Sequence, residues 1–127
     1  MKPLELPWPR AELSPNTQAH WTVKAKAKAQ YGRTCQSLAA AAKFGTFGRQ
    51  HVELRLDFYP PDHRQYDLDN MLARMKSGID GICRAIGIDD VQIRKIIVRI
   101  DRETTRGIVA ATITEIKESA DGINENL

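Results

Sequence analysis

Hydrophobic and polar positions alternate along the second half of the chain with the two-residue period that predicts β-strands. Residues His51–Phe58 alternate strictly, so one side of this strand is expected to face a core while the other is charged. The segment from Gln92 to Ile100 is rich in Ile and Val and predicts another strand. Ile108–Ile116 predicts its partner, with residues 101–107 as a polar connector of hairpin type.

Two helices are predicted by apolar residues that recur every three or four positions. The first extends from about Gln18 to Lys43, after a turn at Ser14–Thr17. Its expected buried stripe comprises Val23, Ala27, Tyr31, Thr34, Leu38 and Ala42. The second extends from about Leu68 to Ile86, and Gly87 ends it. Its apolar positions are Leu68, Leu72, Met75, Ile79, Ile82 and Ile86.

These elements, with a short segment at the N-terminus, predict one small α/β domain of the α+β type over residues 1–127. Pro7 and Pro9 restrict the segment from Leu4 to an edge strand or an extended arm. The order is β-α-β-α-β-β, with two helices packed on a mixed sheet of about four strands. We expect a flexible polar tail at residues 117–127.

Composition narrows the class of protein. The chain is 42% hydrophobic, enough for a core, and no apolar run approaches the roughly 20 residues of a membrane span. The N-terminus lacks the apolar region of a signal peptide. Cys35 and Cys83 have no metal-ligand spacing and are expected to be buried free thiols. We therefore expect a cytoplasmic protein with no membrane association.

Basic charge is concentrated in the first part of the chain. Residues 1–50 contain eight Lys or Arg and two Glu, whereas residues 51–127 contain eleven Lys or Arg and fourteen Asp or Glu. A positive surface attracts phosphates, so nucleic acid is a candidate partner. The alternative is a solvated helix face, which also carries scattered lysines.

The candidate chemistry lies in the acidic part, where Asp67 and Asp69 flank the start of the second predicted helix and Asp90 follows its end. Mg²⁺ prefers oxygen ligands and is usually held by one or two carboxylates, with water and substrate phosphate completing its shell. Carboxylates in a positive frame therefore suggest metal-assisted cleavage of a phosphodiester. Asp67 alone could instead cap the helix, and Asp89–Asp90 could simply open a turn.

The helix between Asp69 and Asp90 separates the acids that the metal-site hypothesis requires to meet. A helix of roughly 18 residues is about 27 Å long, so the returning chain or a second subunit would have to bring Asp90 to Asp69. Asp69, Ala73, Lys76 and Asp80 lie on one stripe of that helix. Lys76 could therefore contact a scissile phosphate, or it could form an i, i+4 pair with Asp80.

Three motifs together resemble the RusA family of Holliday-junction resolvases, namely Leu6–Pro9, Asp67–Asn70 and Gly87–Gln92. The resemblance covers nearly the whole chain. It implies a small mixed sheet with two helices, and a homodimeric endonuclease that acts on four-way DNA junctions with Mg²⁺. We expect that Mn²⁺ can substitute for Mg²⁺. The family's three essential acids correspond to Asp67, Asp69 and Asp90.

Two positions depart from the family pattern. Family members often have a lysine four residues after the second Asp, where this chain has Ala73, and Lys76 or Arg74 could replace it. The run of arginines before the first Asp is reduced to Arg64. Both departures concern DNA affinity or turnover rather than the metal ligands.

The resulting hypothesis is Mg²⁺-assisted resolution of four-way junctions by paired symmetric nicks, in DNA recombination and repair. Lys76 is the candidate catalytic cation beside the three acids. The candidate phosphate contacts are Lys24, Lys28, Arg64 and Arg74. A non-catalytic DNA-binding protein on the same fold and a nuclease for other branched nucleic acids are the alternatives.

Overall fold

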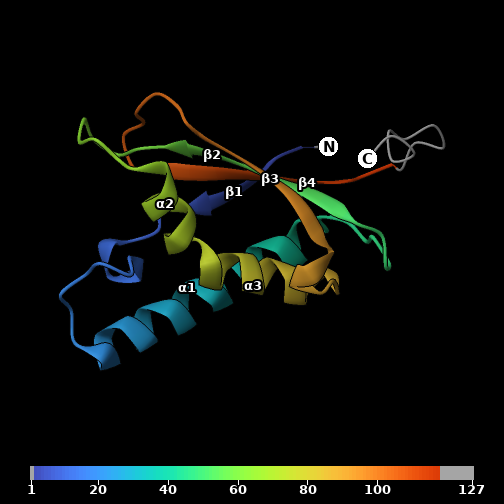
Figure 1. The fold of residues 1–127 in the computed structure, drawn as a ribbon, viewed down its shortest axis with the longest axis horizontal. Coiled ribbons are helices and arrows are strands. Elements are labelled where there is room, and N and C mark those ends of the chain that lie inside the picture. The colour runs from blue at the N-terminus through green and yellow to red at the C-terminus, as the bar shows by residue number, and fades with distance from the viewer. Residues whose placement is uncertain (1, 118–127) are drawn as a thin grey trace, which may run out of the picture.

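A mixed sheet of four strands forms one layer of the structure, and the helices lie on one of its faces (Figure 1). The computed structural model describes residues 2–117. In the sheet order β1-β4-β2-β3, β4 pairs antiparallel with both β1 and β2, and β2 pairs in parallel with β3. The strands are β1 (Leu4–Pro7), β2 (Val52–Tyr59), β3 (Ile93–Ile100) and β4 (Ile108–Glu115).

The small α+β fold predicted from the sequence is confirmed, with helices between the strands and a mixed sheet. β1 lies at one edge of the sheet and pairs with β4 alone. A proline is tolerated there because the missing N–H would not have to donate to a second neighbouring strand. Every second residue of β2 is buried, as the alternating pattern predicts. No helix in residues 2–117 is long and apolar enough to cross a membrane. The predicted tail, apart from Lys117, lies outside the described residues.

The predicted hairpin between β3 and β4 is wrong, because β2 lies between these two strands. The connector at residues 101–107 crosses the end of β2 instead. The Asp101 amide donates to the Phe58 carbonyl at 2.7 Å, and the Thr104 amide donates to the Pro60 carbonyl at 2.8 Å. Composition explains the arrangement, since β3 carries three cationic side chains that favour an edge, whereas every second residue of the first six in β4 is buried.

The first predicted helix is α1 (Trp21–Ala41), which begins later than expected because the His20 ring accepts a hydrogen bond from the Thr22 amide and caps it. Its buried residues are Ala27, Tyr31, Gly32, Cys35 and Ala39. Only two of them belong to the predicted stripe. Its other members are not buried: Val23, Thr34, Leu38 and Ala42.

Close packing against a second helix explains this shift of the buried seam. The second predicted helix is divided into α2 (Leu68–Arg74) and α3 (Lys76–Ile86). α3 packs against α1 at positions where both helices have small side chains. A Cβ atom at Gly81 would lie 2.2 Å from the Gly32 carbonyl oxygen. The helices therefore approach most closely at their glycines, and Tyr31 of the predicted stripe packs over Gly78. Cys35 and Cys83 are buried and free, as predicted.

The division of the second helix at Met75 corrects the prediction of one continuous helix. The Met75 amide bonds to the Leu72 carbonyl three residues earlier, as in a 3₁₀ turn, and its ψ is −6°. The Met75 side chain is completely buried, and its sulfur lies 3.4 Å from the Tyr31 hydroxyl. Packing of Met75 into the core thus coincides with a bend that the helical period does not predict.

Candidate functional site

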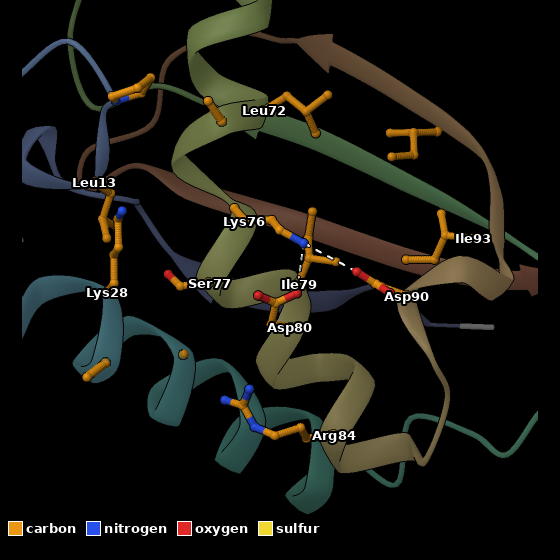
Figure 2. A pocket seen from close by; sticks show the side chains of 15 residues that line it. Leu13, Lys28, Leu72, Lys76, Ser77, Ile79, Asp80, Arg84, Asp90 and Ile93 are labelled. Carbon is orange, nitrogen blue, oxygen red and sulfur yellow. Dashed lines mark hydrogen bonds and ion pairs between the residues drawn. The ribbon is translucent and has the colours of Figure 1, made fainter. Parts of the chain in front are cut away.

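A groove opens between α1, the α2–α3 segment and the start of β3 (Figure 2). Its volume is about 810 Å³, and its walls are mainly aliphatic, with Leu72 and Ile79 from the helices and Ile93 and Ile96 from β3. Polar and charged side chains interrupt this surface, namely Lys28, Lys76, Ser77, Asp80, Arg84 and Asp90. Several predicted site residues therefore share one groove.

Lys76 lies between two carboxylates. Its ammonium nitrogen is 3.2 Å from Asp80 Oδ1 and 3.4 Å from Asp90 Oδ2 (Figure 2). Hydrogen bonding to Asp80, and to Asp90, raises the pKa of Lys76. Hydrogen bonding with Asp89, and then with Lys76, lowers the pKa of the Asp90 carboxyl. The Lys76 and Asp90 side chains are 66% and 51% exposed, so solvent and salt screen this pair.

The chain returns to Lys76 through a well-bonded turn. Gly87 ends α3 with a φ of 72°, in the left-handed region that glycine adopts most easily. Asp89 and Gln92 then form a reciprocal capping box around the short 3₁₀ helix η2 (Asp90–Gln92). The Gln92 side chain also donates to two backbone carbonyls in the loop before β2. This turn carries Asp90 back to the first residue of α3.

Asp67 and Asp69 lie at the start of α2. Asp67 is the N-cap, and its Oδ1 accepts from the Asp69 amide at 2.8 Å and from the Asn70 amide at 3.4 Å. The capping role considered for Asp67 is therefore present. Asp69 is exposed in the first helical turn, where the helix dipole favours an acid.

A polar network joins the first turn of α2 to the N-terminal arm. The Asn70 amide nitrogen donates to the buried Ser14 hydroxyl at 2.7 Å, and its oxygen accepts from Arg74 Nε at 3.1 Å. Arg74 also donates to the Pro9 carbonyl at 3.2 Å, and its guanidinium lies over the Tyr66 ring. Burial lowers the pKa of Arg74. These contacts give Arg74, a predicted phosphate contact, a structural role.

The other predicted DNA contacts lie on two separate surfaces. Arg64 is exposed and paired with Asp62 at 2.8 Å. Lys24 and Lys28 lie on α1, and neither joins an ion pair within residues 2–117. Lys28 lines the groove (Figure 2). The structure therefore brings Lys28 to the same groove as Lys76, while Arg64 lies outside it.

The three predicted metal ligands do not form one cluster in the described chain. No group of three or more His, Cys, Asp or Glu side chains in residues 2–117 is arranged to hold a metal ion. Asp90 lies beside Lys76, whereas Asp67 and Asp69 lie one short helix away. The returning chain thus explains the approach of Asp90 to α3 but not a site shared by all three acids.

Two features of the site were not singled out by the sequence pattern. Arg84 follows Asp80 by four positions, so one more turn of the same helix stripe leads to it and to the groove. Ser14 and Asn70 are separated by 56 positions, and no local signal predicts their hydrogen bond. The capping box around η2 does have a local signal, because Asp-x-x-Gln is a capping pattern.

Comparison with known proteins places the chain among relatives. No protein-family model matches it. An uncharacterized protein of Xylella fastidiosa is 41% identical over 124 residues, which cover 94% of this chain and 80% of that protein. The chain belongs to the family of that Xylella protein. The name of the Xylella protein specifies no activity, so the likeness shows kinship alone.

Proposed function

We propose that the protein is a metal-dependent endonuclease for branched DNA, as the resemblance of its motifs to the RusA family implies. The observation that carries the proposal is the contact between Lys76 and Asp90, across 14 positions of the chain and inside the groove. An exposed ion pair contributes little to stability. Charged groups with shifted pKa values that gather in a cleft are typical of functional sites.

The carboxylates suit a hard divalent cation in their chemistry. Asp67, Asp69 and Asp90 are all exposed, and Mg²⁺ is commonly held by one or two carboxylates together with water and phosphate oxygens. In this proposal Asp67 and Asp69 supply ligands from the start of α2, and Asp90 supplies one from the start of η2. When bound, Mg²⁺ or Mn²⁺ would supply a Lewis acid that activates water and stabilises the leaving oxygen.

The chain's own residues have separate tasks in this proposal. Lys76 pairs with Asp80 and Asp90 while no substrate is present and so offsets one of their two negative charges, and its exposed side chain can turn to a phosphate in the groove. It is thereby the candidate replacement for the family lysine, whose position Ala73 occupies in the same groove. Asn70 bonds to Ser14 and Arg74 and so fixes the first turn of α2. This turn orients the carboxylates of Asp67 and Asp69.

A homodimer fits the proposal because the acids are divided between two places. β3 is an edge strand, and Ile96 on its groove side is 43% exposed. Open strand edges and exposed apolar side chains are typical of contact surfaces. A second copy covering β3 would approach Asp90, and a twofold arrangement suits two symmetric nicks in a junction.

Cleavage of a synthetic four-way junction with Mg²⁺ tests the proposal. We expect the wild-type protein to introduce paired nicks, and Asp69→Asn and Asp90→Asn to bind the junction without cutting it. Glu5→Gln is the matched control, because it removes an exposed carboxylate from β1, at the opposite edge of the sheet from β3. Its cleavage rate should equal that of the wild type.

The same assay separates the proposal from its rivals. Junction binding without cutting in either Mg²⁺ or Mn²⁺ would favour a non-catalytic DNA-binding protein, for which the divided acids are the supporting observation. Faster cutting of flaps or of branched RNA than of the junction would indicate a nuclease for another branched substrate.

A further inference from the structure

Trp21, the first residue of α1, is 71% exposed, which is unusual for so large an apolar side chain. Its ring lies beside the His20 ring, with 5.7 Å between centroids. None of the first six residues of α1 is buried, and these turns extend beyond α3 (Figure 1). The exposed indole contributes little to the core, and its ring face is accessible to a partner.

Cations follow Trp21 along one side of the helix. Lys24 and Lys28 come three and seven positions later, so at 3.6 residues per turn the three side chains project to the same side. Lys28 lies about 10 Å from Trp21 along the helix axis, and it lines the groove together with Lys76 and Arg84 (Figure 2). α1 contains four Lys or Arg and no Asp or Glu.

We propose that Trp21 stacks on a base left unstacked at the branch point of the DNA, while Lys24 and Lys28 lead the phosphates of that strand to the groove. This inference rests on the proposed nuclease function and adds to it the element that distinguishes branched DNA from a continuous duplex. Every base offers a π-face to an aromatic ring when it is not stacked within a helix. The four cations of α1, with no acid on the same helix, favour a polyanion as the occupant of this surface.

The chain contains two tryptophans, so each can be observed alone by fluorescence. Trp8→Phe leaves Trp21 as the only tryptophan. Trp21→Phe leaves Trp8, which packs edge-on against Phe58 and Tyr66 and serves as the reference. Each variant is titrated with a four-way junction and with a continuous duplex of equal length, in EDTA so that the DNA stays intact. Circular dichroism checks that both variants are folded.

We expect the junction to quench Trp21 strongly and the duplex to quench it weakly, with little change at Trp8. Trp21→Ala should weaken junction binding about five-fold to a hundred-fold, as loss of one base stack does, and change duplex binding about two-fold or less. Val23→Ala is the matched control, because this side chain is also exposed near the start of α1 but lies on another side of the helix. Its junction affinity should equal that of the wild type.

The outcomes separate this inference from the proposed function. If the junction is bound and cut while Trp21 emission and Trp21→Ala affinity stay unchanged, the stacking role is overturned and the nuclease stands. If the wild-type protein binds no junction at all, the nuclease and the stacking role both fail. A blue shift of Trp21 that grows with protein concentration in the absence of DNA would assign the ring to self-association and also overturn the inference.

Discussion

The α2–α3 segment positions acidic side chains at two places by different means: at the start of α2, called here the α2 end, and at the start of α3, called here the α3 end. At the start of α2, Asp67 accepts backbone amides, and Asn70 bonds to the buried Ser14 hydroxyl. At the start of α3, Lys76 and Asp90 meet in an exposed ion pair. The first arrangement consists of directed hydrogen bonds anchored on a buried group. The second depends on charges that water and salt screen.

This difference predicts that the α2 end stays fixed, whereas the charged groups at the α3 end can exchange partners. A hydrogen bond to a buried group is costly to break, because the remaining group is left without a partner. An exposed ammonium can move from a carboxylate to a phosphate at small cost. Substitutions at the α2 end should therefore change stability, and substitutions at the α3 end should change titration and activity.

Replacement of Asn70 should have the largest effect on stability. Asn70→Ala removes the donor to the buried Ser14 hydroxyl and the acceptor of Arg74 at once. Because both partners are left partly buried, we expect a loss of about 2 kcal/mol in the free energy of unfolding. Urea denaturation followed by circular dichroism measures this loss.

Two variants sharpen the result at Asn70. Asn70→Asp keeps an acceptor for Arg74 and for the Ser14 hydroxyl, so it should lose less stability than Asn70→Ala. Asn16→Ala removes an exposed side chain. Residue 16 bonds to the Ser14 hydroxyl through its backbone N–H, which the substitution keeps. Its effect should stay within about 0.5 kcal/mol. Equal losses in Asn16→Ala and Asn70→Ala would show that the network does not stabilise the α2 end.

The parts of the fold that the sequence predicts are those with local signals. The alternation along β2, the long helix α1 and the glycine at the end of α3 all depend on neighbouring residues, and the structure confirms each. The position of β4 between β1 and β2 depends on competition among strands from different parts of the chain. Adjacency along the chain therefore suggests a hairpin that does not form.

In the candidate site, too, local spacing predicts some features, whereas contacts between distant segments determine the others. The stripe that joins Ala73, Lys76 and Asp80 follows from helical spacing, and all three line the groove. The approach of Asp90 to Lys76 and the bond from Asn70 to Ser14 depend on how distant segments pack. Residue charge and helical periodicity identify candidate site residues individually, but neither predicts which of them are in contact.

Substitution of Asp67 should separate its capping role from its proposed role as a metal ligand. Asp67→Ala removes the oxygen that accepts two backbone amides and should cost about 1 kcal/mol of stability. Asp67→Asn keeps an oxygen at the cap, so its stability should lie close to that of the wild type. It lacks the carboxylate charge, so junction cleavage should be lost. Thermal unfolding and the cleavage assay, run on both variants, provide the two measurements.

Neutralising Lys76 should have the smallest effect on stability and a clear effect on titration. The pKa of Asp90 is lowered by hydrogen bonding with Asp89 and then with Lys76. Because the folded pKa lies below the unfolded one, the stabilisation from Asp90 is present above the unfolded pKa and is lost as pH falls through the folded value. Lys76→Met should raise the folded pKa of Asp90 toward its ordinary value, as measured by NMR of the carboxyl carbon.

Two controls accompany the titration of Asp90, namely its dependence on salt and the titration of Asp62 as an internal reference. High salt should raise the pKa of Asp90 in the wild-type protein but not in Lys76→Met, because screening acts on a pair that the variant lacks. Asp62, whose pKa is lowered to about 2 mainly by a hydrogen bond from Arg64, does not contact Lys76 and should titrate alike in both proteins. If Lys76→Met leaves the pKa of Asp90 unchanged while Asp62 responds normally to salt, hydrogen bonds with Asp89 and the Val91 amide set that pKa. The α3 end would then be held by hydrogen bonds within its turn, like the α2 end, and the contrast between the two ends would disappear.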